Sequence, residues 1–124
     1  MITEVDENWI YLMKEEKPPY RIFGKYLFFN ENKERLIEIA KKEIENHDFH
    51  VAKVSNTLRG SNTEHVLCLY YKDDSRKNEL ADRNKHEYDV KYRYWKSDAA
   101  TRKGEYSQEF LSKLPEDERK VFQE

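Results

Sequence analysis

The stretch that decides the fold is residues 65–71, which reads His-Val-Leu-Cys-Leu-Tyr-Tyr. Apolar side chains occupy both its odd and its even positions, and its aromatic and β-branched residues favour extended structure. A strand that is apolar on both faces is buried on both sides, so this segment is predicted to lie in the centre of a sheet. The same pattern makes Cys68 a small core residue and not a nucleophile.

Further strands are predicted on both sides of this segment. Residues 49–55 form one of them, joined to the central strand by a polar loop in which Gly60 can take a positive φ angle. Residues 20–29 are aromatic and aliphatic and predict a strong strand, with Gly24 as a candidate for a bulge. Residues 9–12 predict a short first strand.

Two segments have helical spacing. Residues 32–47 predict an amphipathic helix that lies on the sheet, because their apolar side chains recur at helical spacing and charged side chains fill the other side. The apolar positions are Leu36, Ile37, Ala40 and Ile44. Residues 76–86 predict a second helix, but only Leu80 and Ala81 give it an apolar side. We therefore expect a lightly packed outer helix there.

The segment from 88 to 96 alternates in the manner of a half-buried strand. One face is predicted to carry Tyr88, Val90, Tyr92 and Tyr94, and the other Asp89, Lys91, Arg93 and Trp95. Two short helical turns are predicted at 107–114 and 115–122. The resulting order β-β-α-β-β-α-β-α predicts an α+β fold with a mainly antiparallel sheet and helices packed on one face.

Length and composition favour one small folded domain. The 124 residues predict a single domain over 1–124, with a core at about 9–114 and a frayed C-terminal end. Charged residues make up 39% of the chain, but 14% aromatic residues give it enough large apolar side chains to fold. The net charge of −2 creates no global field that attracts nucleic acid, so any anion site must be local.

Several classes of protein are excluded by what the sequence lacks. There is no run of about 18 apolar residues, and the first residues are acidic where a signal peptide is basic. We therefore expect no membrane association. A single cysteine is typical of a reducing compartment, which predicts a cytoplasmic protein. Because a small chain with few apolar residues gains stability from pairing, a homodimer is a fair expectation.

The sequence also lacks the common catalytic motifs. It contains no Gly-rich phosphate loop, no Gly-x-Ser-x-Gly and no His-Glu-x-x-His. His47 and His50 are three residues apart but straddle a predicted helix end and strand start, so no metal site is predicted there. We expect neither a metal nor a cofactor.

Lys53 is the most unusual single residue, since it stands among valines and alanine in a predicted strand, where a buried ammonium group is costly unless it is paired. It is either an edge-strand lysine whose stem covers apolar surface or a functional lysine that binds phosphate or acts as a base. His65 is either a structural histidine or a general acid. These two residues are the candidate catalytic residues if the protein is an enzyme.

A cationic and aromatic surface is the second candidate. Lys91, Arg93 and Lys96 lie on or beside one predicted strand face with Trp95, and Arg102 follows in the loop beyond. Such a surface can stack a base on the indole ring and hold phosphates with the cations. The alternative is a solvated sheet face with Trp95 packed under a helix.

Several short strings resemble those of the basophilic leukaemia expressed protein family, catalogued as phosphothreonine lyase domain proteins. The strings are Gly24-Lys-Tyr-Leu-Phe-Phe, Ala52-Lys-Val-Ser55, Val66-Leu-Cys-Leu-Tyr-Tyr-Lys-Asp-Asp74, and Tyr94-Trp-Lys-Ser-Asp98 with Thr101 and Gly104-Glu-Tyr106. The resemblance spans about residues 9 to 110. It implies a fold similar to that of the cap-binding translation initiation factors, with a curved antiparallel sheet and helices on its convex back. In such a fold Lys53, Arg93, Trp95 and Lys96 are expected near the concave face.

The lyase label implies β-elimination of phosphate, which requires a base, an acid and cations on the phosphate. Under that resemblance Lys53 is the base and His65 the acid, and Arg59, Arg93 or Lys96 holds the phosphate. True cap binding needs two aromatic rings that sandwich the base. Trp9 and Trp95 are the only tryptophans, and nothing in the sequence places them face to face.

The leading hypothesis is a small cytosolic module that binds a phosphate-bearing ligand, RNA or a nucleotide. Its expected ligand-binding residues are Lys53, Arg59, Lys91, Arg93, Trp95, Lys96 and Arg102. One alternative is a metal-independent enzyme that cleaves a phosphate-containing substrate, either a phosphothreonine-type lyase or an oligonucleotide-cleaving nuclease. The other is a protein-interaction domain that uses the charged helix at 76–86.

Overall fold

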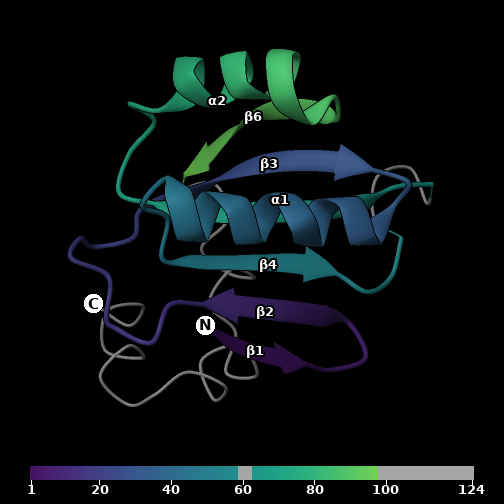
Figure 1. The fold of residues 1–124 in the computed structure, drawn as a ribbon, viewed down its shortest axis with the longest axis horizontal. Helices are drawn as coiled ribbons and strands as arrows, with labels where there is room; N and C mark the ends of the chain where they lie inside the picture. Colours follow the sequence, from purple (N-terminus) through teal and green to yellow (C-terminus); the bar gives the residue numbers. More distant parts are fainter. Residues whose placement is uncertain (59–62, 98–124) are drawn as a thin grey trace.

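The computed structural model describes residues 1–58 and 63–97, which form an open sheet with helices on one side (Figure 1). The elements in chain order are β1 (Ile2–Val5), β2 (Trp9–Met13), β3 (Gly24–Asn30), α1 (Lys33–Asn46), β4 (Val51–Ser55), β5 (His65–Tyr71), α2 (Lys77–Arg83), the single π-helical turn η1 (Asn84–Tyr88) and β6 (Lys91–Ser97). The predicted α+β class is confirmed. The two helical turns predicted within 107–122 lie outside the described residues.

The six strands are arranged in the order β1-β2-β4-β5-β3-β6, and every neighbouring pair is antiparallel. The central position predicted for residues 65–71 is confirmed, because β5 lies between β4 and β3. β1 was not predicted, since its sequence Ile-Thr-Glu-Val is half polar and most of it is exposed at the sheet edge.

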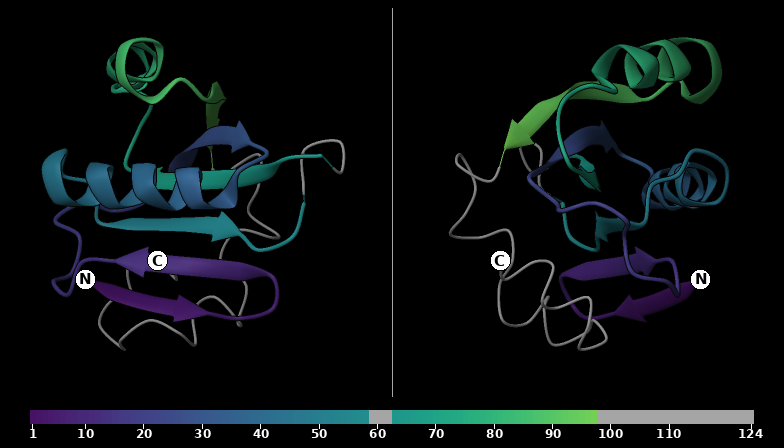
Figure 2. Two further views of the ribbon diagram at one scale, coloured as in Figure 1. Left: turned by 45° about the vertical axis from the view of Figure 1, so that its right-hand side comes forward. Right: turned by 90° about the vertical axis from the view of Figure 1, so that its left-hand side faces the viewer.

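Both helices lie on the same side of the sheet (Figure 2). α1 is capped by Asn32, whose side chain accepts a hydrogen bond from the amide of Arg35. Its buried apolar side chains join the core that covers this helix side; they are Leu36, Ile39, Ala40 and Ile44. α2 adds only Leu80 to that core, which confirms the light packing predicted for the outer helix.

A second apolar cluster occupies the opposite face of the sheet, which we call the far face. It includes Tyr11, Met13, Val51, Leu27 and Cys68. Cys68 is 2% exposed, as predicted for a core residue. The inner strands are therefore buried on both sides, which explains why their sequences are apolar at odd and even positions alike.

The prediction for residues 88–96 is wrong in two respects. Tyr88 belongs to η1, and the chain turns into β6 through Asp89 with a φ angle of 53°. The pairing of β6 with β3 then shifts in register, because Leu27 pairs with Tyr94 and Phe28 pairs with Tyr92. This bulge leaves Arg93 without a partner in the register and turns Tyr92 and Tyr94 to opposite faces of the sheet.

Gly24 is the first residue of β3 and not the bulge predicted there. A Cβ atom at this position would lie 2.5 Å from the indole ring of Trp95 and 2.6 Å from the carbonyl oxygen of Lys96. Glycine is therefore needed so that β6 and its tryptophan can pack closely on β3. Among the described residues, no helix is both long and apolar enough to cross a membrane.

Candidate functional site

A groove of about 400 Å³ lies between α2 and β6. We call it the α2–β6 groove, and its lining residues are Asp74, Lys77, Asn78, Ala81, Tyr92, Arg93, Tyr94 and Trp95. This set combines aromatic rings with two cations, an amide and a carboxylate. Because β6 is the outermost strand of the described sheet, residues from both of its faces can line one groove.

Two aromatic rings of the groove are held by the core on the helix side. Trp95 pairs with Tyr26 in the register of the sheet, and their ring centroids are 4.8 Å apart. Tyr92 pairs with Phe28, with ring centroids 5.0 Å apart. Tyr94 points to the far face and is 47% exposed. The bulge in β6 thus supplies rings on both sides of the strand.

Most polar residues of the groove come from α2 and the segment that leads into it, namely Asp74, Lys77 and Asn78. The ammonium group of Lys77 is 3.8 Å from the carboxylate of Asp74, and both side chains are more than half exposed. Burial raises the pKa of the Tyr92 phenol, and the negative charge of Asp74 adds to the shift. The phenol therefore keeps its proton at neutral pH and can donate a hydrogen bond.

The cations predicted on β6 gather around one carboxylate. Oε1 of Glu64 is 3.8 Å from the ammonium nitrogen of Lys91 and 3.9 Å from a guanidinium nitrogen of Arg93. The Arg93 guanidinium also lies 4.7 Å above the centre of the Phe29 ring. We call Lys91, Arg93 and Glu64 the edge cluster.

Trp95 does not share a face with the edge cluster. The expectation of one surface with alternating cations and indole is wrong, because the bulge at Arg93 places Trp95 on the helix side. Lys96 lies opposite Lys25 of β3 in the sheet register. The predicted surface is therefore divided between two faces that meet at the edge of β6.

Lys53 lies far from the groove. Its strand, β4, is separated from β6 by β5 and β3, so Lys53 is not the edge-strand lysine of the simpler interpretation. It is only 5% exposed, and its ammonium nitrogen is 4.0 Å from the centre of the Trp9 ring. A cation–π contact of this kind stabilises a buried lysine.

His65 and Lys53 are on opposite sides of the sheet. Strand alternation places His65 on the helix side with Leu67 and Leu69, whereas Lys53 shares the far face with Val51. Nδ1 of His65 is 2.8 Å from the carbonyl oxygen of Ser55, which occupies one ring nitrogen. The structure does not bring the two candidate catalytic residues together.

Arg59 and Arg102 lie outside the described residues. Within residues 1–58 and 63–97, no group of three or more His, Cys, Asp or Glu side chains is placed to hold a metal ion.

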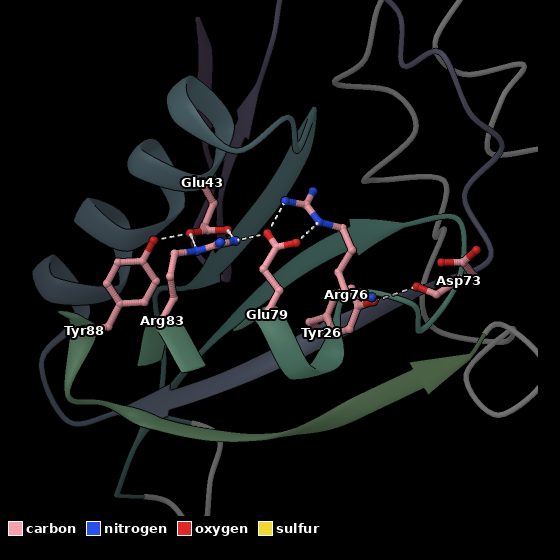
Figure 3. Close-up of polar contacts among 7 residues, drawn as sticks. All are labelled: Tyr26, Glu43, Asp73, Arg76, Glu79, Arg83 and Tyr88. Atoms are coloured by element: carbon pink, nitrogen blue, oxygen red, sulfur yellow. Dashed lines mark hydrogen bonds and ion pairs between the residues drawn. The ribbon is translucent and has the colours of Figure 1, made fainter. Parts of the chain in front are cut away.

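A buried polar network links α1 to α2, and the sequence analysis missed it (Figure 3). Glu43 of α1 is fully buried and accepts two hydrogen bonds from Arg83, of 2.8 Å and 2.7 Å, and a third from the hydroxyl of Tyr88. Arg83 also pairs with Glu79 at 2.7 Å, and Glu79 pairs with Arg76 at 2.5 Å. We call these five residues the helix network.

The charges of the helix network stabilise one another. Hydrogen bonds from Arg76 lower the pKa of Glu79 to about 2 against the opposing effect of burial, and hydrogen bonds from Arg83 add to the shift. Burial by itself lowers the pKa of Arg83, but the hydrogen bonds and charge of Glu43 outweigh it and the pKa is raised. The sequence did contain a signal, since Glu43 falls on the apolar stripe of α1 between Ala40 and Ile44.

Comparison with family models, curated proteins and solved structures finds no match for this chain. The family resemblance and the cap-binding-factor-like fold therefore stay predictions.

Proposed function

We propose that this chain is a small cytosolic module that binds a phosphate-bearing ligand, RNA or a nucleotide, in the α2–β6 groove. The observation that carries the proposal is a groove of about 400 Å³ lined by aromatic residues together with Arg93 and Lys77. The rings of Tyr92 and Trp95 lie on the helix side of the sheet, where α2 borders this groove. Stacking on aromatic rings contributes about 1–3 kcal/mol per base, and cations contribute a salt-dependent attraction to phosphate.

The arrangement of the rings supports this proposal. Trp95 packs against Tyr26, and Gly24 leaves room for its indole ring because it has no Cβ atom. The ring is therefore already fixed, and little conformational freedom is lost when a base stacks against it. Asp74 can accept and Asn78 can both donate and accept hydrogen bonds, which gives the groove groups that can contact a base edge.

Only some of the ligand-binding residues expected from the sequence belong to the proposed site. Arg93 and Trp95 line the groove, and Lys91 lies beside it in the edge cluster. Lys53 is left out, because two strands separate it from β6. Lys53 and Trp9 form a contact of their own within the far face.

The test is fluorescence anisotropy with a short, labelled single-stranded RNA of mixed sequence. Trp95→Leu removes the indole ring on the groove side of the sheet and should weaken binding about fivefold or more, since a stacked base is worth about 1–3 kcal/mol. Arg93→Ala should weaken binding and lower the slope of log Kd against log salt by about one. Lys41→Ala removes an exposed cation on α1 and serves as the matched control.

Two results would contradict the proposal. One is a wild-type protein that binds neither this RNA nor the four nucleoside monophosphates at low salt. The other is binding that Trp95→Leu and Arg93→Ala reduce no more than Lys41→Ala does, because such binding would be a general charge effect.

A further inference from the structure

Glu64 faces two of the cations on β6, and one of them, Arg93, also lines the α2–β6 groove. A single carboxylate oxygen faces both Lys91, at 3.8 Å, and Arg93, at 3.9 Å. The Glu64 side chain is 18% exposed, whereas those of Lys91 and Arg93 are 55% and 41% exposed. The anion is thus the more enclosed partner, and the cations reach into solvent around it.

Both distances are close to the limit of about 4 Å for an ion pair and are too long for hydrogen bonds. Glu64 therefore leaves the N–H donors of both cations available to another anion. Arginine prefers to bind an anion through two parallel hydrogen bonds, and a phosphate group offers several acceptor oxygens where Glu64 presents one. A phosphate that approaches Arg93 from the groove therefore competes with Glu64 for the same guanidinium group.

We infer that Glu64 is a counter-anion that the phosphate of the ligand displaces from Lys91 and Arg93. This inference rests on the proposed function of the α2–β6 groove and assigns the edge cluster as its phosphate subsite. In the free protein Glu64 neutralises part of the charge on the two cations. It thereby selects for ligands with a full phosphate charge and weakens the attraction of other anions.

The consequence is that loss of this carboxylate should tighten binding. Glu64→Gln keeps the size of the side chain and removes the competing charge, so the Kd for the labelled RNA and for a nucleoside monophosphate should fall about two- to fivefold at low salt. The affinity for the corresponding uncharged nucleoside should not change. Glu4→Gln removes the same charge from an exposed carboxylate on β1, at the opposite edge of the described sheet, and is the control.

A second variant separates this effect from changes in folding. Glu64→Asp keeps the charge but shortens the side chain, so it should give a Kd between those of wild type and Glu64→Gln. Melting temperatures of all variants, measured without ligand, identify any variant that is not folded.

The outcomes distinguish the inference from the function on which it rests. Binding that needs Trp95 and Arg93 but is the same in Glu64→Gln and Glu4→Gln would overturn the inference alone. An equal gain for the nucleoside and the monophosphate would also overturn it. Absence of any binding by the wild type and both glutamine variants would overturn the proposed function and this inference together.

Discussion

The two helices lie on the same side of one sheet but are held there by different forces. α1 buries four apolar side chains in the core, namely Leu36, Ile39, Ala40 and Ile44. α2 buries only Leu80. Its polar attachments are the helix network through Glu43 and the hydrogen bonds between the Tyr26 hydroxyl and the segment before α2. One helix is held mainly by the hydrophobic effect and the other largely by charged hydrogen bonds.

This difference matters because the groove lies against the second helix. Apolar packing has no charge that protons can titrate or that salt can screen, whereas a network of carboxylates and guanidinium groups responds to both. α2 and its leading segment supply Asp74, Lys77 and Asn78 to the lining of the groove. A change in the helix network therefore reaches the groove, while a change in the α1 packing affects the whole fold.

The largest effect is expected from Leu36→Ala in α1. Leu36 is fully buried, so its truncation leaves a cavity and should lower the free energy of unfolding by about 2–5 kcal/mol. Because α1 covers the central strands, the loss should appear in one cooperative transition in urea. Leu58→Ala truncates a leucine that is 47% exposed, and it should change the free energy of unfolding by less than about 0.5 kcal/mol. Equal costs for the two variants would contradict the assignment of α1 to the core.

A smaller and more local effect is expected from Glu43→Gln. The change removes the charge that pairs with Arg83, but Arg83 keeps Glu79 as a partner and is 14% exposed. We expect a loss of about 1–3 kcal/mol, below the cost of a fully isolated buried charge. Amide hydrogen exchange should speed up more in α2 and η1 than in β4 and β5.

Glu45→Gln is the control, since it removes an exposed carboxylate from the same helix. A uniform increase in exchange throughout the protein with Glu43→Gln would mean that the helix network stabilises the whole fold. The contrast between the two helices would then be lost.

Much of the fold follows from local patterns in the sequence. Residues 65–71 were predicted with the bounds that β5 has, because this short apolar run contains the aromatic and β-branched residues that favour a strand over a buried helix. The bounds of β6 were missed because Tyr88 fits an alternating strand as well as it fits a helical turn. The bulge at Arg93 could not be predicted, since it arises from the register between β6 and β3.

The candidate site was harder to predict for a similar reason. Arg93 and Trp95 were selected from local composition, and both line the groove. Lys53 was selected by the same reasoning but lies on β4, because strand order is not encoded in the periodicity of a single strand. Asp74 and Lys77 were missed because their role depends on α2 lying beside β6, which is a tertiary arrangement.

The smallest expected effect is a pH dependence of the stability of the fold, caused by Glu79. Its pKa is lowered from the ordinary value of 4.5 to about 2, mainly by hydrogen bonds from Arg76. The Glu79 carboxylate therefore binds a proton at a higher pH in the unfolded chain than in the folded chain. As a result, Glu79 stabilises the fold fully only above pH 4.5. The stabilisation is lost as the pH falls from 4.5 towards 2.

The measurement is the difference in melting temperature between the wild type and Glu79→Gln across this pH range. Gln cannot be protonated there, so the wild type should be the more stable protein near neutral pH, and its advantage should shrink steadily on acidification. Glu87→Gln, in the exposed part of η1, should differ little from the wild type at any pH. If the advantage over Glu79→Gln stayed constant down to pH 2, the pairing with Arg76 and Arg83 would not be what anchors α2, and apolar contacts through Leu80 would have to hold the helix as they hold α1.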